Sequence, residues 1–261
     1  MRYGHSMRFN RFCFGFGLVF FVGGSSPAQA SIVNVLQPQV GEPEEGWAVQ
    51  GRVGLGLEAG NEEKQKFSVL AGARRVWGAN QTLLKGSLDR ATTFGETSTD
   101  RSFVHFRHRV SLSESWVGFG FAQLEHNGFR SLKVRDLFGL GIERSLWRTQ
   151  RSEAAIATAI MSEHEVLLLD VEPLPPRLRS SNYFVLALDL GDGLTLGSTT
   201  FFQPRLAEFS DWRLLEDLTL TVSLGERVSW TVSCKMEMDS RPPAEVNPWD
   251  VVVKTGLGWS Y

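Results

Sequence analysis

Four of the five histidines and two serines are the residues of this chain whose types could support nucleophilic catalysis. They are His105, His108, His126, His164, Ser113 and Ser162. A serine hydrolase needs a serine within hydrogen-bond reach of a histidine, and a third group that orients the histidine. No nucleophile motif surrounds either serine. The sequence therefore predicts no catalytic residue.

The run Glu163-His164-Glu165 contains three possible metal ligands. Adjacent residues of a β-strand point to opposite faces, so these side chains would not converge on one ion. Glycines two residues apart, at 54 and 56, 118 and 120, and 139 and 141, look superficially like parts of a nucleotide-binding loop. On strands, such pairs relieve crowding on one face or permit curvature. We therefore expect neither a metal nor a cofactor.

Charged residues at alternating positions are further candidates, because they would share one face of a strand. Six are basic and six acidic: Arg52, Glu58, Lys85, Asp89, Arg107, Arg109, Glu143, Asp189, Lys235, Glu237, Asp239 and Lys254. Charges of both signs can line a water-filled passage or pair with one another and close it. The sequence leaves both possibilities open. The absence of a stripe of one sign argues against pronounced ion selectivity.

These residues would be positioned by β-strands, since apolar side chains recur with a period of two along most of the chain. Residues 228–239 alternate without exception between an apolar and a polar set. The pattern predicts strands at 47–59, 64–77, 81–94, 101–112, 116–126, 133–147, 152–165, 178–190, 194–203, 212–224, 228–239 and 249–261. His108 and Glu216 interrupt the apolar set, and a bulge would account for Glu216.

The strands and their connections predict an all-β fold, a transmembrane antiparallel up-and-down β-barrel of about 12 strands. Each strand reaches the roughly 9–11 residues that a tilted membrane strand needs. Short connections such as 78–80, 113–115 and 191–193 alternate with longer ones such as 166–177 and 240–248. Short periplasmic turns and longer outer loops are typical of outer-membrane barrels. Twelve strands would give a lumen between that of filled eight-stranded barrels and open porins.

Aromatic residues near the strand ends agree with a membrane barrel. Amphipathic rings gather at the two membrane interfaces and form an aromatic girdle. The predicted girdle consists of Trp47, Trp77, Trp116, Trp147, Trp212, Trp230, Trp249, Trp259 and Tyr261.

The N-terminus has the features of a secretory signal peptide. Three arginines precede an apolar run at 12–23, and Ala28-Gln29-Ala30 is a small-x-small cleavage site. We expect residues 1–30 to be removed, 31–46 to form a disordered periplasmic leader, and 47–261 to form the barrel. Three of the 27 basic residues and none of the 29 acidic ones lie in 1–30, which gives the mature chain a net charge of −5. That charge argues against a nucleic-acid partner.

The C-terminus resembles the β-signal that the outer-membrane assembly machinery reads. Lys254, Gly256, Trp259 and Tyr261 occupy the four defined places of that signal. The sequence therefore predicts the bacterial cell outer membrane as the location. It predicts outer-membrane lipid, lipopolysaccharide, the assembly machinery and periplasmic chaperones as partners.

The order of several motifs resembles the salt-induced outer-membrane protein family (YdiY-like), whose molecular function is unknown. The motifs are Gly46-Trp47 and Gly60-Asn61 around the first strand, 127–135 followed by Gly139-Leu140-Gly141, and 240–243 before the last strand. The resemblance covers 46–261 and departs at the leucine- and proline-rich loop 166–177. It implies a barrel and names no ligand. The favoured function is a narrow pore for small hydrophilic solutes. A plugged structural envelope barrel is the alternative, and an outer-membrane lipid-modifying enzyme is less favoured.

Overall fold

The computed structural model describes residues 18–19, 32, 34–36, 45–60, 63–128, 132–167, 175–225, 227–242 and 247–259. These residues form one antiparallel sheet. Its strands are β1 (Leu18–Val19), β2 (Gly46–Glu58), β3 (Lys64–Trp77), β4 (Asn80–Thr93), β5 (Glu96–Ser111), β6 (Trp116–Asn127), β7 (Leu132–Arg148), β8 (Ser152–Leu167), β9 (Arg177–Gly191), β10 (Leu194–Arg205), β11 (Glu208–Ser223), β12 (Val228–Asp239) and β13 (Trp249–Trp259).

The twelve long strands are those predicted from the alternation of apolar and polar residues. β3 and β12 have the predicted bounds, whereas β5 and β11 begin five and four residues earlier, at Glu96 and Glu208. In each of those two cases the strand extends back into a hairpin whose turn is shorter than the predicted loop. The all-β, up-and-down antiparallel architecture is therefore confirmed.

The turn between β4 and β5 shows how a local sequence sets such a hairpin. Phe94 and Gly95 both have positive φ, 51° and 79°. A two-residue turn with two positive φ values matches the right-handed twist of the flanking strands. Glycine takes this conformation at no steric cost, whereas Phe94 does not. Thr93 and Glu96 consequently pair directly, and β5 begins where a loop was expected.

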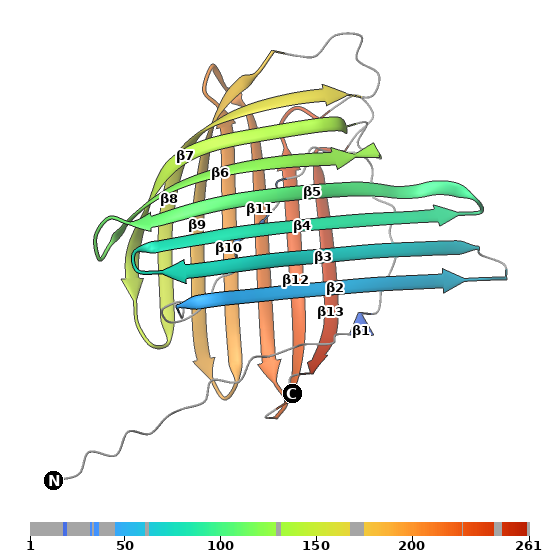
Figure 1. The fold of residues 1–261 in the computed structure, drawn as a ribbon, viewed down its shortest axis with the longest axis horizontal. Helices are drawn as coiled ribbons and strands as arrows, with labels where there is room; N and C mark the ends of the chain where they lie inside the picture. Colours follow the sequence, from blue (N-terminus) through green and yellow to red (C-terminus); the bar gives the residue numbers. More distant parts are fainter. Residues whose placement is uncertain are drawn as a thin grey trace.

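Every long strand pairs with its neighbours in sequence, and the sheet order runs from β2 to β13, followed by β1. The first half of the sheet, β2 to β7, lies in front of the second half in Figure 1. Among the described pairings none joins β13 to β2. The free edge of β13 instead pairs with β1, through Leu18 with Leu257 and Val19 with Gly256. Because β1 belongs to the predicted signal peptide, its removal would leave that edge available to β2.

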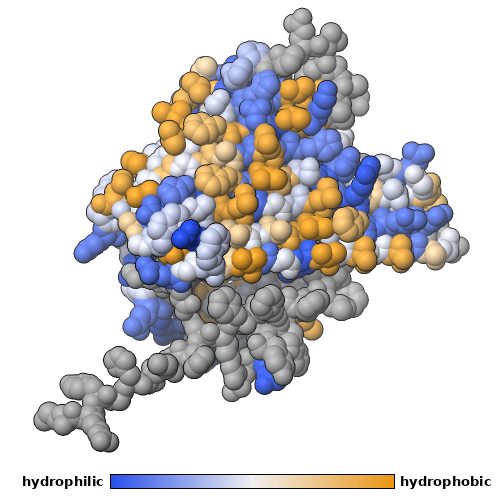
Figure 2. Space-filling view, in the orientation of Figure 1, coloured by the Kyte–Doolittle hydropathy of each residue, from blue (hydrophilic) through white to orange (hydrophobic). Residues whose placement is uncertain are grey.

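Alternation places large apolar side chains on the outward face of the curled sheet. Leu55 and Leu57 are about four-fifths exposed, and many others are at least half exposed. Figure 2 shows hydrophobic side chains spread over the strands on the face in view. No helix in the described parts of the chain is long and apolar enough to cross a membrane.

Two polar residues interrupt the outward face without breaking the register. The pairing of β11 with β10 and β12 is continuous through Glu216, so the predicted bulge is wrong. The Glu216 carboxylate accepts hydrogen bonds from Ser198 Oγ (2.6 Å) and Thr200 Oγ1 (2.5 Å). His108 Nδ1 lies 2.8 Å from Thr82 Oγ1. Neighbouring strands thus supply polar partners to both side chains.

Candidate lumenal site

The inward face of the sheet contains two buried groups of side chains. The first, which we call the ion-pair network, lies toward the long-loop ends of β6 to β12. It is built on Arg135, Arg179 and Arg213 around Glu163. The second, the aromatic chamber, lies near the middle of the strands. It consists of Phe119, Phe121, Tyr183 and Phe201 together with His105, Arg107, Gln123 and Gln203.

Three arginines converge on one carboxylate in the ion-pair network. Glu163 is 1% exposed, and its oxygens lie 3.0 Å from Arg135 Nη2, 2.6 Å from Arg179 Nε and 2.5 Å from Arg213 Nη1. Arg135 on β7 and Arg179 on β9 flank Glu163 on β8, because neighbouring strands bring their inward side chains together. Arg213 is on β11, and it reaches Glu163 across the curled sheet. A buried charge of this kind is tolerated only when it is paired and hydrogen-bonded.

Further carboxylates balance the three arginines. Arg179 Nη2 lies 2.7 Å from Asp211, Arg213 Nε lies 3.2 Å from Asp239, and Arg135 Nε lies 3.5 Å from Glu165. Strand register sets two of these pairs, since Arg213 faces Asp239 and Arg135 faces Glu165. Each arginine therefore has at least two acidic neighbours. The network crosses the lumen as a set of paired charges in which the carboxylates outnumber the three arginines.

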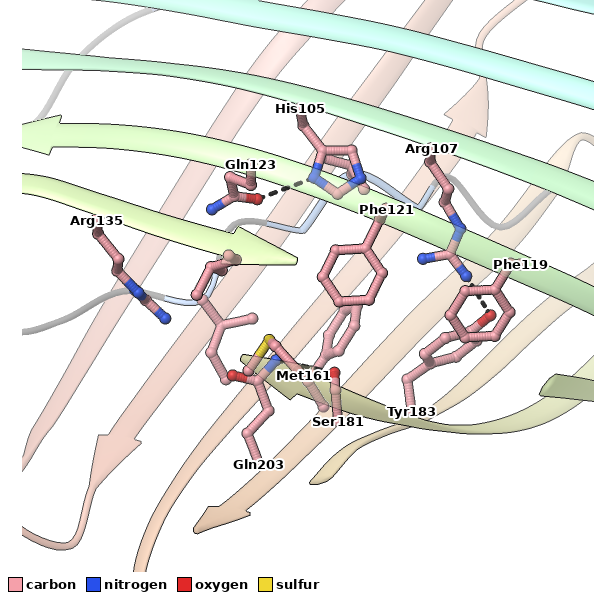
Figure 3. A pocket seen from close by; sticks show the side chains of 14 residues that line it. His105, Arg107, Phe119, Phe121, Gln123, Arg135, Met161, Ser181, Tyr183 and Gln203 are labelled. Atoms are coloured by element: carbon pink, nitrogen blue, oxygen red, sulfur yellow. Dashed lines mark hydrogen bonds between the residues drawn. The ribbon is translucent and has the colours of Figure 1, made fainter. Parts of the chain in front are cut away.

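The aromatic chamber is a chain of ring contacts across the lumen. Ring centroids are 6.5 Å apart for Phe119 and Phe121, 5.8 Å for Phe119 and Tyr183, and 5.5 Å for Tyr183 and Phe201. The His105 ring stacks on Phe121 at 5.9 Å. Figure 3 shows the rings of His105, Phe119, Phe121 and Tyr183 gathered in one space. Offset and tilted rings at such separations attract one another beyond their burial.

Two inward glycines on β7 make room for the rings of β6. A Cβ atom added at Gly139 would lie 2.5 Å from the Phe121 ring, and one at Gly141 would lie 2.7 Å from Cζ of Phe119. Any larger residue would therefore push the rings away. The interpretation that these alternating glycines relieve crowding agrees with this geometry. Gly118 and Gly120 lie on the outward face instead, beside Leu112 and Leu140.

Arg107 is the cation of the chamber. It is 4% exposed, and its guanidinium carbon lies 4.1 Å from the Phe119 ring centroid and 5.3 Å from that of Tyr183. Arg107 Nη2 donates a hydrogen bond of 2.6 Å to the Tyr183 hydroxyl, drawn as a dashed line in Figure 3. Tyr183 in turn donates to Glu143, and Glu143 pairs with Arg109. One carboxylate thus serves two guanidinium groups.

Polar side chains complete the wall of the chamber. His105 Nδ1 lies 3.0 Å from Gln123 Oε1, and Gln203 Nε2 donates to Ser181 Oγ at 3.1 Å. Four polar atoms of the chamber are buried and have no hydrogen-bond partner among the described residues. They are His105 Nε2, Gln123 Nε2, Gln203 Oε1 and Arg107 Nε.

A segment near the N-terminus occupies the lumen beside the chamber. Ile32 and Val35 are 6% and 5% exposed, and Ile32 packs in the same cluster as the chamber rings. Asn34 Nδ2 donates to Asp217 at 3.1 Å, and the Leu36 amide donates to Asn34 Oδ1 at 2.9 Å. The sequence predicted a periplasmic leader over 31–46, whereas residues 32 and 34–36 of that leader lie against the inner wall.

A polar cavity adjoins this segment on the turn side of the chamber. It has a volume of about 450 Å³ and is lined by Asn34, Lys85, Asp217, Thr219, Thr221 and neighbouring residues of β9 and β10. The space next to the rings is far smaller, about 30 Å³. A volume of that size holds about one water molecule. The N-terminal segment and the chamber therefore narrow the lumen together.

The structure distributes the predicted lumen residues unevenly. Four of them are buried: Arg107, Glu143, Glu237 and Asp239. Lys235 pairs with Glu237. Asp89 lies 3.7 Å from Arg101, and Asp189 lies 3.8 Å from Arg151. Arg52, Glu58 and Lys254 are exposed on β2 and β13, at the two ends of the sheet.

The central residues of the ion-pair network escaped prediction, as did the chamber rings. β8 carries alanines on its inner face and shows no clear apolar alternation, so the inward direction of Glu163 was not evident. One signal in the sequence could have indicated the network. Glu163 and Glu165 are two residues apart and so share a face of β8, and Arg179 and Arg213 lie at the corresponding level of later strands. This match becomes visible only when the predicted strands are placed side by side in register.

Among the described residues, no hydrogen bond joins one of the four histidines considered for catalysis to Ser113 or Ser162. At the long-loop end, His164 Nδ1 lies 2.9 Å from Asp136, and His126 Nε2 lies 3.4 Å from Asp100. Ser113 is at the opposite end, where its Oγ accepts from the Trp116 amide at 3.2 Å. In the run 163–165, for which the sequence predicts no metal site, His164 faces outward while Glu163 and Glu165 face the lumen.

The predicted aromatic girdle and the two terminal signals are partly described. Six tryptophans of the girdle are 37–61% exposed: Trp47, Trp77, Trp116, Trp147, Trp230 and Trp249. Trp212 is half-buried. Lys254 and Gly256 lie on β13. Ala28, Ala30, Tyr261 and the side chain of Trp259 lie outside the described residues.

A curled antiparallel sheet with an apolar outward face and a charged interior defines the class of up-and-down β-barrels. Within that class the chain belongs to a family described as "Protein of unknown function, DUF481", whose model matches residues 51–261. The family assignment is consistent with the resemblance found in the sequence. No curated protein sequence matches the chain.

Solved barrels resemble the structure at low sequence identity. The NanC porin is 9% identical, with a TM-score of 0.48 and coverage of 77% of this chain and 97% of that one. The KdgM porin in complex with disordered oligogalacturonate is 9% identical, with a TM-score of 0.43 and coverage of 77% and 95%. The translocator domain of autotransporter NalP from Neisseria meningitidis is 12% identical, with a TM-score of 0.38 and coverage of 82% and 87%.

Proposed function

We propose that the protein is an outer-membrane β-barrel that forms a narrow pore for small hydrophilic solutes. The observation that carries the proposal is the contrast between the two faces of the sheet. Leucine, valine and tryptophan side chains are exposed on the outward face, whereas the inward face carries charged and polar groups. Outward apolar and inward polar residues are what a membrane barrel with a hydrophilic lumen requires.

The polar cavity supports a passage on the turn side of the lumen. Its volume of about 450 Å³ lies within the range of small-molecule sites. The N-terminal segment and the chamber narrow the lumen beyond it, so solute passage requires the segment at 32–36 to move. A pore of this kind conducts weakly or intermittently.

The ion-pair network favours a second candidate, a structural envelope barrel with a permanently closed lumen. Its charged groups are paired with one another and lie in the lumen near the long-loop end. The two candidates differ in a single observable, the passage of ions through the purified protein.

Single-channel recording in planar lipid bilayers separates these candidates. For the pore we expect small conductance steps from the mature protein, and larger or longer ones when residues 32–36 are deleted. If neither form gives steps, the pore is wrong and the structural barrel is favoured.

The outer-membrane location depends on the C-terminal signal and is tested separately. The assembly machinery and periplasmic chaperones are the proposed partners of this step. Replacing Tyr261 with Asp removes the terminal aromatic ring, so we expect little heat-modifiable protein in outer-membrane fractions. A matched change on the same strand, Asp250→Asn, leaves the signal intact and should assemble normally. Normal assembly of the Tyr261→Asp variant would contradict the proposed signal.

A further inference from the structure

Arg107 is a buried cation without a carboxylate of its own. Among the described residues, its one polar contact is the hydrogen bond to Tyr183, and no acidic side chain pairs with it. Glu143 is already paired with Arg109. Two guanidinium groups therefore face a single carboxylate, which leaves one positive charge unbalanced in the chamber. Burying such a charge is costly unless an anion offsets it.

The Arg107 guanidinium has aromatic neighbours but few hydrogen-bond partners. Its central carbon lies over the Phe119 and Tyr183 rings, at 4.1 and 5.3 Å from their centroids. On its edge, Nη2 donates to Tyr183 whereas Nε donates to no described residue. A guanidinium edge is the geometry that carboxylates and phosphates recognise. The free Nε is thus positioned for an anionic oxygen.

Other unsatisfied polar atoms surround the same space. His105 Nε2, Gln123 Nε2 and Gln203 Oε1 are buried, and all three side chains line the chamber. Figure 3 shows these side chains arranged around the rings. They include a donor and an acceptor, and a histidine nitrogen can act as either. Hydroxyl groups both donate and accept, so a hydroxylated ligand would satisfy them together.

From these observations we infer that the aromatic chamber binds a small hydroxylated carboxylate. Arg107 holds the carboxylate, and His105, Gln123 and Gln203 bind the hydroxyl groups. The rings of Phe119 and Phe121 contact the carbon skeleton. The inference rests on the proposed function only in taking the lumen as the route by which the ligand arrives.

The N-terminal segment occupies the place of this ligand. With Ile32 and Val35 beside the rings, the free space of about 30 Å³ is too small for a hydroxylated carboxylate. Binding therefore displaces Ile32 and Val35 from the chamber. Since the segment and the ligand compete for one space, deletion of 32–36 should strengthen binding.

Calorimetric titration of the purified mature barrel in detergent tests the inference with three matched probes. Gluconate has a carboxylate and hydroxyl groups, sorbitol has the same carbon number without the charge, and hexanoate has the charge without the hydroxyl groups. We expect gluconate to bind at least ten times more tightly than either of the others. Deletion of residues 32–36 should raise the gluconate affinity by about threefold or more.

Variants assign the binding to the chamber. Arg107→Gln should weaken gluconate binding at least tenfold and leave sorbitol unchanged, and Arg107→Lys should recover part of the loss. Gln123→Ala should weaken gluconate binding and leave hexanoate unchanged. Arg144→Gln is the matched control, because Arg144 stacks on Trp116 on the outward face. Heat-modifiability on gels confirms that each variant is folded.

The inference is overturned if gluconate binds no more tightly than sorbitol, or if Arg107→Gln and Gln123→Ala both leave its affinity unchanged. Undetectable binding of all probes to both the mature and the truncated barrel also overturns it. Gluconate binding without conductance steps would refute the pore and retain the site. Conductance steps without a preference for gluconate over the other probes would refute the binding site and retain the pore.

Discussion

The ion-pair network and the aromatic chamber are both buried in one lumen, yet they treat charge in opposite ways. In the network, three arginines share Glu163 and each has a further acidic neighbour. In the chamber, Arg107 has aromatic rings and one hydroxyl. A paired group is complete without a ligand, whereas an unpaired one is not. Burial alone therefore does not identify a functional residue, but burial without a counter-charge does point to one.

The largest effect is expected at the centre of the network. Glu163→Gln keeps the size of the side chain but leaves Arg135, Arg179 and Arg213 without their shared charge. Removing one partner of a buried ion pair costs about 3–5 kcal/mol. We expect the free energy of unfolding, measured by urea titration of tryptophan fluorescence in detergent, to fall by about that amount.

The control for this change is an ion pair near the surface. Glu153 lies 2.7 Å from Arg148, and the two side chains are 16% and 35% exposed. Exposed pairs contribute about 0–1 kcal/mol. We expect Glu163→Gln to lower the free energy of unfolding more than Glu153→Gln does. Equal losses of this free energy would show that the buried network stabilises the barrel no more than a surface ion pair.

Overpacking the chamber should have an intermediate effect. In Gly141→Ala, the added Cβ overlaps the Thr158 carbonyl oxygen, Cβ of Ala159 and the Phe119 ring. Overpacking of a well-packed interior costs roughly 1–3 kcal/mol. Gly118→Ala adds the same atom on the outward face, where the nearest atom is 3.5 Å away on Leu112, and should change the midpoint of unfolding little.

Removing the unpaired cation should barely change stability, in contrast to Glu163→Gln. Arg107→Met loses the contacts with Phe119 and Tyr183 but also relieves an unbalanced buried charge. Losses of about 1 kcal/mol from the ring contacts and the hydrogen bond are offset by the lower cost of burial. We expect the free energy of unfolding to change by about 1 kcal/mol or less. A loss comparable to that of Glu163→Gln would mean that Arg107 is structural.

The smallest effect is expected at the margin of the network. Arg205 lies 3.6 Å from Glu208 and 3.8 Å from Asp211, and its side chain is 31% exposed. Arg205→Gln should lower the free energy of unfolding by less than about 1 kcal/mol, since water screens the pair. A larger loss in the same urea titration would extend the structural network to the rim.

The sequence by itself determined the strands and, wherever apolar and polar residues alternate, the face to which each side chain points. A period of two fixes the orientation of every residue relative to its strand neighbours, so Arg107, Glu143 and Glu237 could be assigned to the interior. It did not reveal the hairpin at Phe94-Gly95, because a positive φ at phenylalanine is uncommon.

Only the tertiary structure decided which inward residues meet. Arg107 and Tyr183 are 76 residues apart, and Arg213 and Glu163 are 50 apart. Their contact depends on the curvature of the sheet, which the alternation of side chains does not encode. The position of Ile32 and Val35 in the lumen follows from the same cause. An apolar segment packs wherever curvature leaves apolar space, and in this chain that space lies beside Arg107 and the chamber rings.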